Sequence, residues 1–317
     1  MVSWLGMAAP LLAQTKSTVS VTVQGSNAQQ LPIECVQSPL ISSKFDINAP
    51  QPFVYSFTTD QAPLALVVDG NTTVLMMPGD SVHAAIRYEN KSRSAFITGS
   101  PEAVAANKLR QQLEGWRRKN KYHSQLLKCV ALDQKPTVRL EASRRLAAAT
   151  DSLCAKWAGK ANATLVAYVR AEQEAAVYQS LMEYPKMYED VRKQKIADQG
   201  IGDYWALMDG VQLRDDDAAM ACPEYGMMLM RYCAYMREKQ ALAEGKTYAL
   251  PNTLEAMYAE FAGFFEGRQR DYVLYNLLCN YLMNGKQIER MLPLVDDYKA
   301  KYNLNAAYVS TLEHFLQ

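Results

Sequence analysis

The sequence predicts an α+β protein in which a small antiparallel β-sandwich or barrel-like domain, residues 14–100, precedes an all-helical bundle, residues 101–317. Up to Gly99, hydrophobic and polar residues alternate with a period close to two, which is typical of half-buried strands. From Ser100 onward, hydrophobic residues recur with the 3.6-residue period of helices. The length of 317 residues also favours two domains over one.

Seven short runs of alternating residues predict the strands. The first, TVSVTVQG, places Val19, Val21 and Val23 on one face and polar residues on the other. Most of the runs are bounded by Gly, Pro, Asn or Asp, as strands usually are. The other six runs are LPIECVQ, FVYSFTT, LALVVDG, TVLMM, SVHAAIRY and SAFITG.

Two turns predict hairpins within this region. Asp69-Gly70-Asn71 supplies residues that tolerate positive φ between two hydrophobic runs. In MMPGDSVHA, Pro78 presets φ and Gly79 takes the left-handed position of a tight turn.

The helical region opens on a strong start signal. Ser100 can cap a helix whose first residue is Pro101, and Glu102 lies favourably in its first turn. Its apolar face is predicted to contain Leu109, Leu113 and Trp116.

Further along the chain, two apolar stripes predict a pair of helices. Asn252 and Glu255 form a capping-box pattern before the first stripe, which Gly267 is expected to close. The second stripe is expected to end at Gly285. Short connections between such helices favour antiparallel packing in a bundle.

The global composition excludes some classes of partner. With 34 basic and 33 acidic side chains, the net charge is +1, so nothing draws the whole chain to nucleic acid. No apolar run after the N-terminus approaches the roughly 18 residues that a membrane span needs, so no transmembrane span is expected. Residues 1–13 resemble a partial secretory signal, which predicts export to the periplasm or cell envelope; the alternative is a buried N-terminal segment.

The stretch RDDDAAMACPEYG could suggest a metal site. Asp215, Asp216 and Asp217 are adjacent, so on a helix they diverge and cannot converge on one ion. Instead, Asp215 or Asp216 is expected to cap the following helical turn. Pro223 is expected to begin a helix that buries Tyr225. No metal or cofactor site is predicted.

Six cysteines are scattered without a CxxC pair or zinc-type spacing, which favours buried, inert thiols. Cys222 is a weak redox candidate, because it precedes Pro223 at a helix N-terminus, where the dipole lowers a thiol's pKa.

The three histidines are isolated from one another. The basic run WRRKNKYH, with Arg117, Arg118, Lys119 and Lys121, is interpreted as a solvated helix end. The 19 tyrosines favour core packing, with an interface as the alternative.

Several short motifs carry a resemblance to a known family. In VLMMPGDSVHAAIRYENKSRSAFITGSPEAVAANKLRQQL these motifs are Pro78-Gly79-Asp80, Ile97-Thr98-Gly99-Ser100 and Asn107-Lys108-Leu109. Together with DYWALMDGVQLRDDDAAMACPEYGMMLMRYCAYM, they resemble the N-terminal region of TlpA-like thiol:disulfide oxidoreductases of Gram-negative bacteria. The resemblance implies a signal, a small β-domain and a helical segment that precede a thioredoxin domain. This chain contains no WCxxC-like motif, so the family's redox cysteines have no counterparts in it.

Three functional hypotheses follow. The first is a non-catalytic accessory region of a cell-envelope thioredoxin-like protein, partnered by a thioredoxin domain in cis or by another envelope protein. The second is an independent extracytoplasmic protein that binds a peptide or glycan in a groove between sheet and helices. The third is an enzyme with dispersed catalytic residues, although no converging constellation is visible in the sequence.

Overall fold

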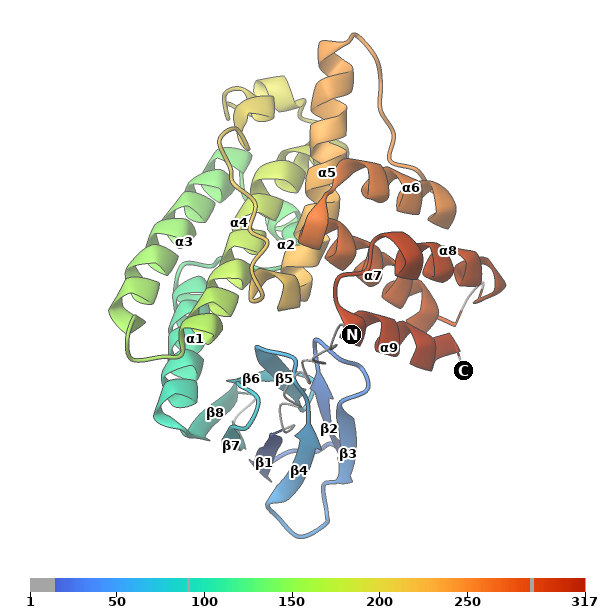
Figure 1. The fold of residues 1–317 in the computed structure, drawn as a ribbon. Helices are drawn as coiled ribbons and strands as arrows, with labels where there is room; N and C mark the ends of the chain where they lie inside the picture. The colour runs from blue at the N-terminus through green and yellow to red at the C-terminus, as the bar shows by residue number, and fades with distance from the viewer. Residues whose placement is uncertain (1–14, 90–91, 286–287, 317) are drawn as a thin grey trace, which may run out of the picture.

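The computed structural model describes residues 15–89, 92–285 and 288–316 (Figure 1). It is a mixed α+β structure with two four-stranded sheets and nine α-helices in the described residues. The last strand ends at Gly99 and the first helix begins at Pro101, and no strand follows within the described part. The proposed signal at residues 1–13 lies outside the described residues.

The eight strands form two sheets of four. Seven of them match the predicted runs; β3 was missed, because SSKFD contains only one large hydrophobic residue and no position of the strand is fully buried. The first sheet has the order β4 (Phe53–Thr58), β1 (Lys16–Gln24), β7 (Ser81–Glu89), β8 (Ser92–Gly99). The second has the order β3 (Ser42–Asp46), β2 (Gln30–Cys35), β5 (Leu64–Val68), β6 (Thr72–Met76).

The β-region is predominantly antiparallel, as predicted, with one parallel strand pair. β1 runs parallel to β7, with Val19 opposite Val82. Parallel neighbours need a long crossover connection, and here the chain builds the whole second sheet and β4 between the two strands.

The two predicted turns have different outcomes. Asp69 (φ 55°) and Gly70 (φ 64°) form the hairpin between β5 and β6, as predicted. Gly79 takes the left-handed position (φ 87°), but the second hairpin prediction is wrong. This turn carries the chain from β6 in one sheet to β7 in the other, and the Asp80 carboxylate fixes it by accepting the Met77 N–H at 2.8 Å.

One hydrophobic cluster receives side chains from both sheets. Val19, Val21 and Val23 of β1 are buried in it, as the alternation predicted. Ile33 of β2 and Val74 of β6 reach the same cluster from the second sheet. The β-region therefore has a core of its own.

The helices follow without interruption by strands. Ser100 caps the first of them by accepting the Ala103 N–H at 3.3 Å, which confirms the predicted start. The α-helices are α1 (Pro101–Lys119), α2 (Leu126–Ala131), α3 (Pro136–Trp157), α4 (Ala163–Arg192), α5 (Pro223–Ala243), α6 (Leu254–Phe264), α7 (Gly267–Met283), α8 (Ile288–Lys301) and α9 (Ala306–Leu316). Three 3₁₀ turns, η1 (Ile196–Asp198), η2 (Tyr204–Ala206) and η3 (Ala219–Ala221), lie between α4 and α5.

The boundary between α6 and α7 differs from the prediction. The cap of α6 is Thr253, whose hydroxyl accepts the Ala256 N–H, and not Asn252. Glu255 does not close a capping box, because its carboxylate is paired with Arg290 of α8. Gly267 does not end α6 but begins α7, whereas Gly285 follows the end of α7 as expected.

Tyrosine hydroxyls cross-link the helical region. Each of several buried tyrosines donates to a main-chain carbonyl of another segment: Tyr122 to Ala176, Tyr184 to Gln134, Tyr204 to Met182, Tyr235 to Tyr204, and Tyr308 to Met220. The buried Arg139 guanidinium lies over the Tyr122 ring, 3.7 Å from its centroid. These tyrosines therefore serve the core, as predicted, by burying the ring and satisfying the hydroxyl.

No helix among the described residues is long and apolar enough to cross a membrane.

Candidate binding cleft between the β-region and the helices

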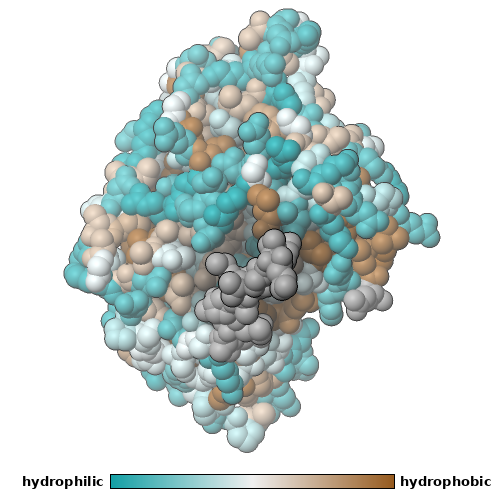
Figure 2. All heavy atoms as spheres, in the orientation of Figure 1, coloured by the Kyte–Doolittle hydropathy of each residue, from teal (hydrophilic) through white to brown (hydrophobic). Residues whose placement is uncertain are grey.

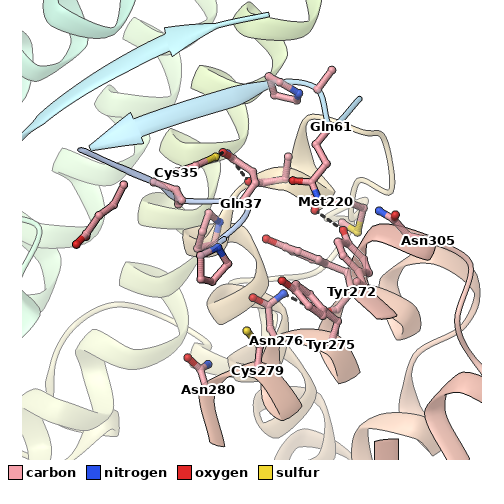
Figure 3. A pocket seen from close by; sticks show the side chains of 18 of the residues that line it. Cys35, Gln37, Gln61, Met220, Tyr272, Tyr275, Asn276, Cys279, Asn280 and Asn305 are labelled. Atoms are coloured by element: carbon pink, nitrogen blue, oxygen red, sulfur yellow. Dashed lines mark hydrogen bonds between the residues drawn. The ribbon is translucent and has the colours of Figure 1, made fainter. Parts of the chain in front are cut away.

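A cleft of about 590 Å³ separates the second sheet from α7, α9 and the start of α5 (Figure 3). Its β-side is formed by the end of β2, the segment that follows it and the loop before β5. A cleft of this size, between two regions that have separate cores, is a common place for a ligand.

Gln37 fixes the β-side of the cleft relative to the helices. Its Oε1 accepts the Ala65 N–H at 2.9 Å, and its Nε2 donates to the Ala221 carbonyl at 2.9 Å. One side chain thereby joins β5 to η3, and Gln37 and Ala221 are 184 residues apart in the sequence. The two walls are held together before any ligand enters.

The helical wall is one face of α7. The residues of this face recur at the three- and four-residue spacing that aligns side chains along a helix. Those that line the cleft include Tyr272, Tyr275, Asn276, Cys279 and Asn280. Their arrangement facing the β-side is visible in Figure 3.

The ring of Tyr308 from α9 supports this face. It stacks on the Tyr275 ring with centroids 4.0 Å apart, and its hydroxyl donates to the Met220 carbonyl at 2.9 Å. This ring is therefore held in place, and its hydroxyl already has a hydrogen-bond partner in the protein.

Amide side chains dominate the polar part of the cleft. Besides Gln37, the lining includes Gln61, Asn276, Asn280 and Asn305. Gln61 Oε1 is buried and has no hydrogen-bond partner. Burying an acceptor without a partner costs free energy, so this atom favours a ligand that donates a hydrogen bond.

The two thiols of the cleft are poor nucleophiles. Burial raises the pKa of both Cys35 and Cys279 above the ordinary value of a thiol. Both therefore stay protonated near neutral pH, and the thiolate is the reactive form.

The aspartates of RDDDAAMACPEYG bind protein groups. Asp216 is the capping residue, since its Oδ1 accepts the N–H groups of Ala218 and Ala219 at 3.1 Å each. Its other oxygen accepts from Arg214 Nε at 2.7 Å. Asp217 is paired with Arg268, and both residues line the cleft.

The rest of that stretch also follows the prediction. Pro223 is the first residue of α5, and Tyr225 is fully buried.

Within residues 15–89, 92–285 and 288–316, no group of three or more His, Cys, Asp or Glu side chains is arranged to hold a metal ion.

Cys222 does not have the lowered pKa that its place before α5 predicted. It is fully buried, and burial raises its pKa well above the ordinary value, with further upward effects from Glu224 and Glu172. Desolvation outweighs the helix dipole here, because the thiolate would lose all of its hydration. All six cysteines are buried and none is in a disulfide.

The motifs that carried the family resemblance are structural. Gly99 (φ 148°) lies so close to β7 that a Cβ would be 2.6 Å from the Ser81 carbonyl oxygen. Asn107 is 2% exposed; its Oδ1 accepts the Leu75 N–H at 2.9 Å, and its Nδ2 donates to the Leu75 carbonyl at 2.8 Å. It thus satisfies the backbone of β6, an edge strand, and joins α1 to the sheet.

No protein-family model, curated protein or solved structure matches this chain.

The residues of the cleft were not predicted from the sequence. One signal was present: Asn276 and Asn280, four residues apart, put two amides on one side of the otherwise apolar run from Tyr272 to Met283. The partners from the β-side, Gln37 and Gln61, lie in irregular segments, where periodicity gives no information.

Proposed function

We propose that this chain is a non-catalytic binding protein of the cell envelope, and that the cleft holds an extended peptide segment. The observation that carries the proposal is the amide-lined cleft with the buried, unpartnered Oε1 of Gln61. Peptide N–H and C=O groups alternate as donor and acceptor, and amide side chains offer the complementary pair.

A peptide fits the cleft better than a glycan. Tyr272, Tyr275 and Tyr308 are each at most 9% exposed, so none offers a free ring face against which a sugar could stack. Asp217 and Arg268 compensate each other, so Glu34 is the one lining residue whose charge no ion pair among the described residues compensates.

The proposal accommodates the accessory role that the resemblance implies. The cleft would hold a segment of a partner polypeptide, and a thioredoxin domain in cis or another envelope protein would supply the redox chemistry. The face in Figure 2 is mainly hydrophilic, with hydrophobic residues in small separate areas, which favours recognition in a cleft over a broad apolar contact there.

We also infer that the two sheets pack as a sandwich and that the helices form a bundle around the remaining core. The cluster shared by both sheets supports the first inference. The contacts of α4 with α3 and α5 support the second.

The binding test uses a pooled library of capped decapeptides, with chitin and cellulose oligosaccharides as competitors for the same cleft, and native mass spectrometry to detect complexes. Asn280→Trp should weaken peptide binding, since it replaces a small amide in the wall of the cleft by a bulky indole. Asn284→Trp, one turn further along the chain and outside the cleft, should bind peptides like the wild type. Binding of oligosaccharides alone, or equal effects of the two substitutions, would contradict the proposal.

A second test addresses catalysis. Because the chain has no CxxC pair, it should not reduce insulin with dithiothreitol as donor. Turnover above the protein-free background that is lost in Cys222→Ser would show that this thiol is catalytic.

A further inference from the structure

A second pocket, of about 250 Å³, lies against α1 and shares none of its lining residues with the cleft. Its walls are the β5–β6 turn with the start of β6, the first residues of β8, and one side of α1. Its lining contains three guanidinium groups, those of Arg93, Arg110 and Arg118, and the carboxylate of Glu114.

Two of these arginines are held in place by the protein. Arg110 donates from Nε and Nη2 to the carboxylate of Glu172, at 3.1 and 2.6 Å, and from Nη1 to Glu114. Arg93 donates from Nη2 to the Asn71 carbonyl at 2.8 Å. A guanidinium has five N–H donors, so both side chains keep donors for a ligand after these bonds are made.

The third arginine supplies charge that the protein does not compensate. Arg118 is exposed at the rim of the pocket and has no ion-pair partner among the described residues. Glu172 and Glu114 compensate Arg110, and Arg93 lies near the Asp69 carboxylate, so Arg118 is the cation of the pocket that no ion pair in the described part of the chain compensates.

A buried hydroxyl gives an independent indication of a ligand. Thr72 lines the pocket and is 5% exposed, and its buried Oγ1 has no hydrogen-bond partner. A hydroxyl can donate to an anionic oxygen, which would remove the cost of leaving it unsatisfied.

We propose that this pocket binds an oxyanion, with Arg118 and Arg93 as the charged donors and the Thr72 hydroxyl as the neutral one. The planar guanidinium fork matches the paired oxygens of carboxylate, sulfate or phosphate, and such charge-assisted bonds are stronger than neutral ones. The proposal does not depend on peptide binding in the cleft.

The test is calorimetric titration of the full chain with sodium phosphate, sodium sulfate and sodium glutarate, each at constant ionic strength in a chloride buffer. We expect saturable binding of at least one of these anions. The phosphate and sulfate arms report a free inorganic anion, and the glutarate arm reports a carboxylate such as that of an acidic side chain. Heats equal to those of chloride for all three would overturn the proposal.

Substitutions locate the binding. Arg118→Gln should weaken it about tenfold or more, as expected for the loss of a charge-assisted bond. Lys119→Gln removes the same charge from the neighbouring residue, which does not line the pocket, and should change the affinity little. Equal weakening by both would show a general surface effect and would contradict the site.

Thr72→Val tests the interior of the pocket with a side chain of the same shape. It should weaken the same anion's binding while preserving the fold, as judged by circular dichroism. Unchanged affinity would remove Thr72 from the site, and unchanged affinity in both Thr72→Val and Arg118→Gln would overturn the proposal.

Discussion

The β-region and the helical region bury their interiors with different chemistry. The cluster shared by the two sheets is almost entirely aliphatic, and the buried polar side chains of the described β-region are only serines and threonines. The helical interior buries Arg139, Asp271 and many tyrosines, whose polar atoms are satisfied by hydrogen bonds between segments far apart in the sequence. An aliphatic core depends on shape and area, whereas a polar one depends on each partner being present.

The first prediction tests how strongly the helical core depends on one aromatic residue. Tyr225→Ala should lower the free energy of unfolding by about 3–5 kcal/mol, because it empties a fully buried aromatic site on α5. In the β-region, Ile33→Val should cost only about 0.5–1.5 kcal/mol. Chemical denaturation of both variants measures these values.

A matched variant separates packing from hydrogen bonding at this site. The Tyr225 hydroxyl accepts the Arg214 N–H at 2.8 Å. Tyr225→Phe should therefore cost about 1–3 kcal/mol, the penalty for leaving a buried donor unsatisfied. If Tyr225→Phe were as stable as the wild type, the polar bond would not matter and the contrast between the two cores would weaken.

The second prediction concerns the joint between the regions. Asn107→Ala should cost about 1–3 kcal/mol, because the backbone N–H and C=O of Leu75 lose their partner in a buried place. Lys108→Ala, on the exposed side of the same helix, should change stability little. Thermal melts of the two variants provide the comparison, and equal melting temperatures would show that the edge of β6 does not need this bond.

Most of the β-region could be predicted from the sequence, because alternation reports which face of a strand is buried. β3 was missed, since its burial is incomplete on both faces. Pairing between β1 and β7 could not be predicted, because two strands that are distant in sequence carry no local sign of their partner.

Local polar motifs in the helical region were also predictable where the cap and its helix are adjacent in sequence, as at Ser100 and Asp216. The candidate sites were not. Gln37 and Asn280 reach one cleft from opposite regions, and Thr72 and Arg118 reach one pocket from a strand and a helix. Such combinations exist only after the regions have packed together.

The third prediction returns to the three aspartates. Asp216→Ala should cost about 0.5–2 kcal/mol, since it removes the acceptor of the Ala218 and Ala219 N–H groups and the partner of Arg214. Asp215→Ala is the matched control and should cost less. Calcium or zinc should not raise the melting temperature of the wild type relative to chelator. A rise that is lost in Asp216→Ala would identify a metal site and overturn the capping role.

The fourth prediction concerns Glu224 at the start of α5, an exposed residue whose carboxylate accepts from the Cys222 thiol at 3.4 Å. Partial desolvation of this carboxylate raises the pKa of Glu224 above its ordinary value, and the nearby Glu172 raises it further. The folded state therefore holds this proton more tightly than the unfolded state. Its contribution to stability is fully present below the ordinary pKa of a glutamate and is lost as the pH rises through the raised value.

Glu224→Gln keeps the shape of the protonated side chain and removes the titration. The variant should resemble the wild type near pH 4 and should be more stable at pH 8, by less than the loss expected for Asp216→Ala. Glu244→Gln provides the contrast, because hydrogen bonds from Lys246 and Gln240 lower the pKa of that exposed carboxyl, so its removal should give no gain at pH 8. Denaturation curves across this pH range show whether the Glu224 carboxylate destabilises or stabilises the folded protein when it is charged. A loss of stability at pH 8 in Glu224→Gln would mean that the carboxylate is charged in the folded protein and is stabilised there, with Arg110 as the nearby cation.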